Sequence, residues 1–253
     1  MTTRPLIMGI LNLTPDSFSD GGRFNTEQSA LKQARKLIRD GADIIDIGGE
    51  STGPNSRNVS LKEELNRVIP ILKKIRKITK IPISIDTYKA EVASQALEAG
   101  ANIINDVTAL RGDKNMASVA AKYNCPIILM YSKDSTQRTT RAPKKYKDVI
   151  KTIKDFWKSR VSYATRHGIK KENIILDPGM GAFVSGIADY SFEIVTRLNE
   201  LTNLGFPVLI GISRKSFLGG HIKERDKKAT SLTTIAVLNG VSIIRTHHVH
   251  SNS

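Results

Sequence analysis

An aspartate and a lysine that follow two separate apolar runs are the residues of this sequence best suited to chemistry. Asp177 stands where the run 174–176 meets a Pro-Gly turn, and Lys215 follows the run 208–210 within Gly-Ile-Ser-Arg-Lys. If both runs are parallel strands of one barrel, their carboxyl ends lie on the same rim. A carboxylate that faces an ammonium group there can hold a flat, polar heterocycle by its hydrogen-bonding edge.

The other apolar runs also end in mostly polar side chains. In chain order these ends carry Asn12, Glu50, Ser51, Thr52, Asp86, Asn105, Asp106, Met130, Arg245 and His247. Asp86 or Asp106 alone could cap the helix that follows, and Asp177 could be only a turn residue. This structural interpretation weakens because several carboxylates and amides would meet a lysine and an arginine on one rim.

One group of these residues suits the edge of an aminopyrimidinone. An aspartate can accept hydrogen bonds from an amino group and a ring N–H together, which fixes the orientation of the ring. The donors and acceptors for such an edge are Asp86, Asn105, Asp177 and Lys215.

A second group suits an anion such as pyrophosphate. Arg245 and His247 supply donors, and Asn12 with the hydroxyls of Ser51 and Thr52 would lie beside them. Asn12 could also reach Mg²⁺ through its carbonyl oxygen, since that ion prefers oxygen ligands and keeps waters and phosphates in its shell. His247 could instead be an ordinary core histidine.

Length and composition exclude several classes of protein. The chain has 253 residues, 40% of them hydrophobic, and we expect a single domain over 1–253 with one large core. No apolar run approaches the roughly 20 residues that span a bilayer, and no stretch resembles a signal peptide. The single cysteine, Cys125, begins an apolar run and fits a small core residue in a reducing compartment. We therefore expect a cytoplasmic protein with no membrane partner.

The net charge of +15 fits either a nucleic acid or a small anionic substrate. Many lysines fall in helical stretches such as 72–77, 144–147 and 223–228, where acids or apolar residues separate them. These stretches have no aromatic stacking pattern and no helix-turn-helix signature. They are typical of solvated helix faces, so no nucleic-acid partner is expected.

Short apolar runs alternate with longer segments of helical period along the chain. The runs cover 6–12, 43–49, 82–86, 102–107, 126–131, 174–179, 207–213 and 242–249. Several helical segments are followed by Gly-Ala or Gly-Phe-Pro, as expected where a glycine cap ends a helix. Eight buried strands that alternate with helices predict an α/β fold, a closed (β/α)₈ TIM barrel. The sequence stops four residues after Val249, so the final helix is expected to be lacking.

A doubly wound open sheet is the main alternative fold. Its dinucleotide-binding form carries Gly-x-Gly-x-x-Gly after the first strand, and that motif is not seen here. Long polar loops are expected after the first, second and fifth strands, at 14–26, 50–60 and 132–147.

With these residues the chain resembles the dihydropteroate synthases, folate-pathway enzymes that join a pterin pyrophosphate to p-aminobenzoate. The matching motifs occur in the family's order and cover residues 6–249. They are Met-Gly-Ile-Leu-Asn-Leu-Thr-Pro-Asp-Ser-Phe-Ser-Asp-Gly-Gly at 8–22, Gly-Gly-Glu-Ser-Thr at 48–52, Ser-Ile-Asp-Thr-Tyr-Lys at 84–89, Ile-Asn-Asp-Val at 104–107, Leu-Asp-Pro-Gly at 176–179, Ser-Arg-Lys-Ser-Phe-Leu-Gly at 213–219 and Arg-Thr-His at 245–247.

The resemblance implies a role for each matched residue. The pterin would be held by Asp86, Asn105, Asp177 and Lys215. The pyrophosphate and a Mg²⁺ cofactor would be held by Asn12, Thr52, Arg245 and His247. The p-aminobenzoate would lie near Ser213, Arg214 and Ser216, and Met130 and Phe183 would also contact substrate. The residues expected to carry catalysis are Asp86, Asp177, Lys215, Arg245 and His247. The family also suggests a homodimer.

The implied mechanism needs no nucleophilic side chain, and no activated nucleophile is apparent in the sequence. Loss of pyrophosphate would leave a pterin methyl cation that the aniline nitrogen attacks. The protein would stabilise the leaving group through Mg²⁺, Arg245 and His247, and would order the loops after the first two strands.

Two segments depart from the family pattern. The usual Ser-Thr-Arg-Pro is Ser-Thr-Gly-Pro at 51–54, so Gly53 stands where an anion-contacting arginine is expected. Arg57 is a candidate replacement. The usual Gly-Phe-Gly after Asp-Pro-Gly is replaced by Gly-Ala-Phe-Val-Ser at 181–185, which displaces Phe183 by one position.

The second departure resembles the mobile, sulfonamide-insensitive synthases. The residues that carry this likeness are Met180, Phe183, Ser185, Gln137 and Arg138. Because sulfonamides mimic p-aminobenzoate, a shifted phenylalanine could reject the bulkier drug and still admit the substrate.

Two other functions stay open. A methyltetrahydrofolate:corrinoid methyltransferase would share the pterin-holding carboxylates, but it needs neither Mg²⁺ nor the pyrophosphate subsite at Arg245. A non-catalytic barrel that binds pterin is the second, favoured by Gly53 and the lacking helix. Release of pyrophosphate from the pterin substrate in the presence of p-aminobenzoate would discriminate among the three.

Overall fold

The computed structural model describes residues 4–14 and 23–250, in which eight parallel strands alternate with helices. The strands are β1 (Leu6–Asn12), β2 (Ile44–Gly48), β3 (Ile83–Asp86), β4 (Ile103–Asp106), β5 (Ile127–Met130), β6 (Ile174–Asp177), β7 (Leu209–Ile210) and β8 (Ile243–Thr246). The helices are α1 (Arg23–Arg39), α2 (Leu61–Ile78), α3 (Ala90–Glu98), α4 (Met116–Tyr123), α5 (Val149–Arg166), α6 (Asp189–Thr196), α7 (Asn199–Thr202) and α8 (Ile222–Leu238). Three short 3₁₀ turns are η2 (Lys171–Asn173), η3 (Gly181–Phe183) and η4 (Ser216–Leu218).

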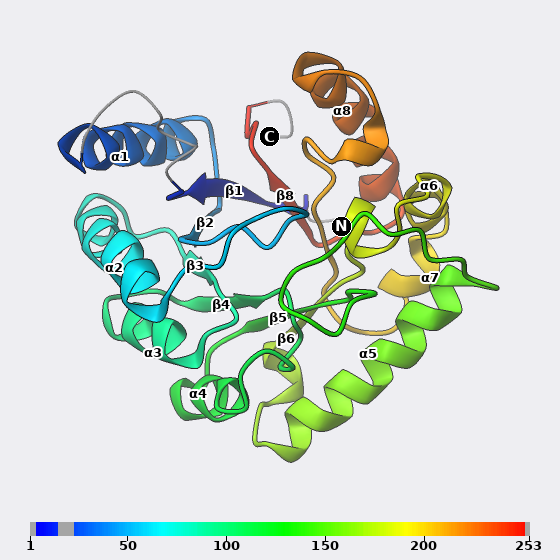
Figure 1. Cartoon of the computed structure of the whole chain (residues 1–253), viewed down its shortest axis with the longest axis horizontal. Helices are drawn as coiled ribbons and strands as arrows, with labels where there is room; N and C mark the ends of the chain where they lie inside the picture. Colours follow the sequence, from blue (N-terminus) through cyan, green and yellow to red (C-terminus); the bar gives the residue numbers. More distant parts are fainter. Residues whose placement is uncertain (1–3, 15–22, 251–253) are drawn as a thin grey trace.

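The strands form a barrel in the centre of the molecule, with the helices around it (Figure 1). The hydrogen-bonded order is β6-β5-β4-β3-β2-β1-β8-β7, and all pairs are parallel. The remaining gap between β6 and β7 is bridged at Leu176 and Val208, where the Leu176 amide donates to the Pro207 carbonyl at 3.0 Å. The predicted TIM barrel is confirmed.

All eight predicted strands are present, and most are shorter than the apolar runs that predicted them. The seventh shrinks most, from the run 207–213 to Leu209–Ile210, and the chain turns soon after it, where the Lys215 amide donates to the Ile212 carbonyl at 3.3 Å. In the part of the chain that the structure describes, no helix follows β8.

Local sequence accounts for the helix ends. The Ser60 hydroxyl caps α2 by accepting from the Glu63 amide at 3.2 Å, and the helix buries a stripe of apolar side chains at helical spacing. The predicted glycine stops are also confirmed, since Gly41, Gly100 and Gly205 follow helices with positive φ.

Alternation along the strands divides the barrel interior into an apolar floor and a polar mouth. The outward-pointing strand residues pack under the helices, in the large core. Inside the barrel a separate cluster forms the floor, from Met8, Ile44, Ile103, Ile128, Ile175, Leu209 and Ile243. The inward positions two residues further along β2, β4, β6 and β8 are Asp46, Asn105, Asp177 and Arg245. The polar groups of the site therefore rest on the floor and face the carboxyl ends of the strands.

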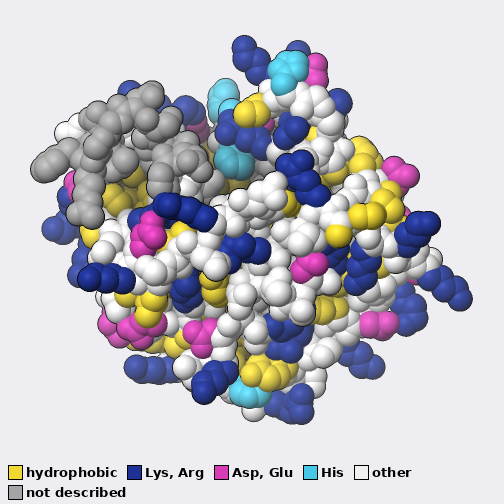
Figure 2. All heavy atoms as spheres, in the orientation of Figure 1, with side chains coloured by type: hydrophobic (Ala, Val, Ile, Leu, Met, Phe, Trp, Pro, Cys, Tyr) yellow, Lys and Arg dark blue, Asp and Glu magenta, His cyan; other side chains and the backbone are white. Residues whose placement is uncertain are grey.

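No helix among residues 4–14 and 23–250 is long and apolar enough to cross a bilayer. On the face visible in Figure 2, lysine and arginine side chains are spread over the surface, with aspartates and glutamates among them.

Candidate active site

Arg245 projects from β8 into the barrel and lies between two carboxylates. Its Nε donates to Asp46 Oδ2 at 2.6 Å, and Nη2 donates to Asp86 Oδ2 at 2.6 Å. Burial lowers the pKa of Arg245, but the charges of Asp46 and Asp86 outweigh this and raise it above its ordinary value. The guanidinium is therefore a fixed cation at the mouth.

Asp46 links this arginine to the next predicted site residue. Its Oδ2 also accepts from the Asn105 Nδ2 at 3.2 Å, and the aspartate is fully buried. Its Oδ1 and the hydroxyl of Ser84, the residue opposite it on β3, have no hydrogen-bond partner among the described residues. Burial raises the pKa of Asp86 above its ordinary value, although the charge of Arg245 acts to lower it.

Asp46 is the site residue that the sequence interpretation missed. It lies inside the apolar run of β2 rather than at its end, so a search of strand ends passes over it. The signal was nonetheless there. A charged residue within a buried strand almost always needs a partner, and the alternation of side chains places it on the inner face.

Asp177 and Lys215 lie together at the end of β6 and the loop after β7. Asp177 Oδ1 accepts from the Gly179 amide at 2.7 Å. Burial raises the pKa of Asp177 to about 6, against the charges of Lys215 and Arg245. Burial, then repulsion from Arg245, lowers the pKa of Lys215 to about 8, while Asp177 and Asp86 act in the opposite direction. Near neutral pH both charged forms are present.

A small apolar wall stands beside these charges. Val107, Met130 and Phe183 form a buried cluster of their own, and the Lys215 Nζ lies 4.8 Å from the centroid of the Phe183 ring. The Phe183 carbonyl accepts from the Lys133 amide at 2.8 Å, which holds its turn against the loop after β5. Charged edges next to a flat apolar wall suit a planar heterocycle.

The remaining predicted residues lie around the rim. Asn12 is exposed at the end of β1, and Thr52 is partly buried in the loop after β2. Ser216 is exposed at the start of η4. His247 Nδ1 lies 3.0 Å from the Ser213 hydroxyl. Burial, then repulsion from nearby arginines, lowers the pKa of His247 to about 3, so its ring is neutral at neutral pH.

Arg57, the candidate replacement for an arginine at Gly53, points to solvent. Its side chain is 71% exposed and pairs with Glu63 at 3.3 Å. A partly buried arginine near this loop is Arg138, which comes from the loop after β5 and pairs with Glu50.

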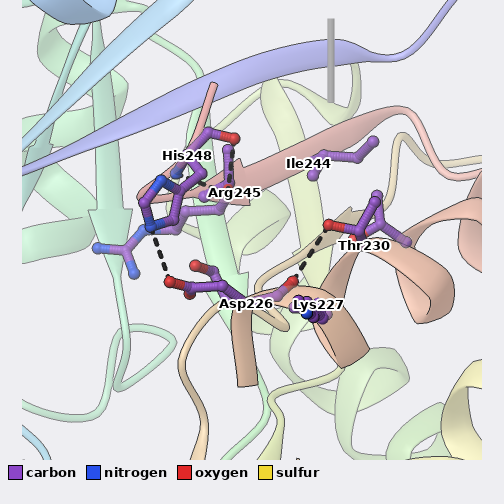
Figure 3. A pocket seen from close by; sticks show the side chains of 10 residues that line it. Asp226, Lys227, Thr230, Ile244, Arg245 and His248 are labelled. Atoms are coloured by element: carbon purple, nitrogen blue, oxygen red, sulfur yellow. Dashed lines mark hydrogen bonds and ion pairs between the residues drawn. The ribbon is translucent and has the colours of Figure 1, made fainter. Parts of the chain in front are cut away.

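A cavity of about 180 Å³ lies between α8 and β8, on the outer side of the strand (Figure 3). Its walls include Ile244 and Thr246, which alternate with the inward-pointing Arg245. At its edge His248 contacts Asp226 at 2.9 Å, which also accepts from Arg214 at 3.4 Å. The cavity shares Arg245 and Ser213 with the candidate active site, but Asp86 and Asp177 do not line it, so it lies beside the site and not at its centre.

The described residues offer a magnesium ion only one or two oxygen donors. Among the described residues, no group of three or more histidines, cysteines or acids gathers to hold a metal ion by itself. The exposed amide of Asn12 offers one oxygen donor, and the Thr52 hydroxyl offers another on the neighbouring loop. Mg²⁺ often takes just one or two protein ligands and completes its shell with water and substrate phosphates. The donors present therefore fit an ion that arrives with a pyrophosphate.

Comparisons with known proteins agree with this site. The family model of pterin binding enzymes matches residues 8–247. The dihydropteroate synthase of Clostridium beijerinckii is 46% identical over 255 residues, covering 99% of this chain and 91% of that protein. The dihydropteroate synthase of Clostridium difficile, solved in the presence of pteroic acid, is 46% identical with a TM-score of 0.90, covering 99% of this chain and 94% of that one. The synthase of Xanthomonas albilineans, solved with 4-aminobenzoic acid, is 36% identical with a TM-score of 0.91, covering 98% and 89%.

The fold is a parallel barrel with buried carboxylates at its mouth, and the family model matches nearly the whole chain. The chain therefore belongs to the family of pterin binding enzymes. The prediction of a dihydropteroate synthase, a transferase, is confirmed by the relatives on both sequence and structure. The roles of individual residues remain predictions.

Proposed function

We propose that the chain condenses 6-hydroxymethyl-7,8-dihydropterin pyrophosphate with p-aminobenzoate, giving 7,8-dihydropteroate and pyrophosphate. The observation that carries this proposal is the arrangement at the mouth. The partly buried Asp86 and the buried Asp177 face Arg245 and Lys215 beside an apolar wall. Carboxylates can accept from the amino group and ring N–H of a pterin, and a lysine can donate to its ring acceptors.

The chain's own residues bind and orient the pterin. Asp177 accepts from the pterin edge with the oxygen that Gly179 does not use, and Lys215 donates from the opposite side. Asn105 adds an amide held in place by Asp46. Met130 and Phe183 cover the ring face and exclude water, which strengthens these hydrogen bonds.

The pyrophosphate leaves on the side of Asn12, Thr52 and His247. A magnesium ion bound with the pyrophosphate would supply charge neutralisation of the leaving group. His247 acts there as a neutral hydrogen-bonding group rather than a cation, because its pKa is about 3. Arg245, fixed by Asp46, contributes positive charge at the barrel mouth. The aniline nitrogen of p-aminobenzoate then attacks the carbon that loses the pyrophosphate, from a site near Ser216 and Arg214.

The test is release of pyrophosphate when the purified chain meets the pterin pyrophosphate, p-aminobenzoate and Mg²⁺. Lys215→Ala and Asp177→Asn should each remove most of the turnover, and near-normal rates in either would refute the pterin assignment. Methyl transfer to a corrinoid, or pterin binding without turnover, would favour the two alternative functions. We also propose that the chain is a homodimer, which its mass in solution tests. We further propose that it is cytoplasmic and has only small-molecule partners, and its location in fractionated cells tests the first of these.

The substituted loop after β6 leads to a proposal about inhibitors. Phe183 is buried against Met130 and Lys215, with its backbone held by Lys133. A ring fixed in this way narrows the p-aminobenzoate end and cannot swing aside for a bulkier sulfonamide. We expect a sulfonamide inhibition constant far above the KM for p-aminobenzoate. A constant as low as that KM would overturn this proposal and leave the activity assignment intact.

A further inference from the structure

Four charged side chains form a buried network beneath the loop after β2. Lys89 Nζ donates to Glu50 Oε2 and to Glu64 Oε2, both at 2.5 Å, and to the Val59 carbonyl at 2.9 Å. Arg138 donates to the other oxygen of Glu50. The Glu50 and Glu64 side chains are 3% and 1% exposed, so their charges are poorly screened by solvent. Two acids and two bases make the network neutral.

Arg138 differs from the other three members because it belongs to another loop. The other members come from consecutive elements: Glu50 follows β2, Glu64 lies in α2, and Lys89 follows β3. Arg138 comes from the segment between β5 and α5, far along the chain. Its Nε is buried and has no partner among the described residues, a cost that the other contacts of the guanidinium must offset.

The contacts of this arginine and its neighbour fasten three loops together. Arg138 Nη2 donates to the Arg57 carbonyl at 3.0 Å, and the Thr139 amide donates to the Thr52 carbonyl at 3.2 Å. The Thr139 hydroxyl donates to the Ala182 carbonyl at 2.8 Å, in the turn that carries Phe183. The loop after β5 thus holds the loop with Thr52 and the turn with Phe183 in one arrangement.

We propose that Arg138 is a positioning residue for the pyrophosphate end of the site, an inference that rests on the proposed function. It docks the segment 49–60 at the barrel mouth and cancels the buried charge of Glu50 below it. Without that cation, the network carries one net negative charge beneath the loop that receives an anionic substrate. Because the surroundings are buried, this charge repels pyrophosphate more strongly than a surface charge would.

The test compares ligands that differ only in charge. Binding of 6-hydroxymethyl-7,8-dihydropterin pyrophosphate with Mg²⁺ and of the uncharged 6-hydroxymethyl-7,8-dihydropterin is measured by titration calorimetry. Arg138→Met should weaken binding of the pyrophosphate by about tenfold and leave the uncharged pterin within about twofold. The double variant with Glu50→Gln is neutral again and should recover most of the loss. Arg166→Met, an exposed change of equal charge at the end of α5, should do nothing.

Three results would overturn the inference. The first is equal weakening for both ligands, which indicates a general loosening of the fold. The second is no recovery of pyrophosphate binding in the double variant. The third is a tenfold loss in Arg57→Met instead of Arg138→Met. If Arg138→Met does not fold, Arg138→Gln with and without Glu50→Gln replaces it, since glutamine also removes the charge but keeps hydrogen-bond donors for the loop. A wild-type chain that binds neither pterin would overturn the proposed function itself, and failure confined to the variants overturns only the role of Arg138.

Discussion

Asp46 should be as important to activity as the residues that touch the substrate, although it lies below them. Its single oxygen Oδ2 accepts from Arg245 at 2.6 Å and from Asn105 at 3.2 Å, and the residue is fully buried. In Asp46→Asn the side chain keeps its shape and loses its charge. The amide oxygen can take the place of Oδ2 and accept both bonds, but it is neutral, so Arg245 retains only Asp86 as a charged partner.

The size of the effect follows from these contacts. A hydrogen bond to a charged group contributes roughly 1.5–3 kcal/mol, and loss of one partner from a buried pair costs roughly 3–5 kcal/mol. Asp86 still balances part of the charge on Arg245, so we expect the free energy of unfolding to fall by about 2–3 kcal/mol. A more weakly held Arg245, with only Asp86 to balance its charge, should lower kcat/KM by about 100-fold, equivalent to about 2.7 kcal/mol of transition-state stabilisation.

The assay is pyrophosphate release, with urea denaturation of the same variant. Ser84→Ala is the matched control, because Ser84 is opposite Asp46 in the register, is fully buried and uses its hydroxyl for no described contact. It should leave both quantities almost unchanged. If Asp46→Asn kept kcat/KM within threefold of the wild type, the argument that Asp46 orients Arg245 and Asn105 would be wrong.

Three further predictions concern the mouth and the turn beside it. The profile of kcat/KM against pH should be bell-shaped. It should fall at pH values below about 6, as Asp177 gains a proton and stops accepting, and at pH values above about 8, as Lys215 loses its proton. An unchanged alkaline limb in Lys215→Met would contradict this. His247→Gln should stay within about tenfold of wild-type kcat/KM because the histidine ring is neutral, and His247→Ala should lose clearly more in the same steady-state assay. Gly179→Ala should lower the free energy of unfolding by about 3 kcal/mol or more, since φ is +65° and an added Cβ would lie 2.4 Å from the Tyr131 carbonyl; a denaturation midpoint equal to the wild type would refute the clash.

Much of the fold was predictable because it depends on local patterns. The eight apolar runs, the helical period between them and the glycines that end helices are each written in consecutive residues. The common position of the candidate residues at one rim was predictable for a related reason. A parallel barrel gathers the carboxyl ends of its strands at one rim, so position along the chain already indicates position in space.

Contacts between distant segments were beyond such reasoning. The sequence interpretation placed Arg245 with the pyrophosphate, and the structure shows its guanidinium between Asp46 and Asp86, far along the chain from both. Which direction a long side chain takes from the rim depends on the charges it meets there. The same holds for Arg138, whose partner Glu50 follows β2 while the arginine follows β5.

These two arginines show how the barrel separates binding from positioning. Arg245 is held from below by Asp46, which is itself out of reach of solvent, so the cation at the mouth is fixed before a ligand arrives. Arg138 is held by Glu50 in the loop layer, where it joins segments that the strands alone do not align. A site preorganised in both layers spends little binding energy on ordering its own groups. Changes at Asp46 should therefore affect pterin with or without its pyrophosphate, while changes at Arg138 should affect only the charged ligand.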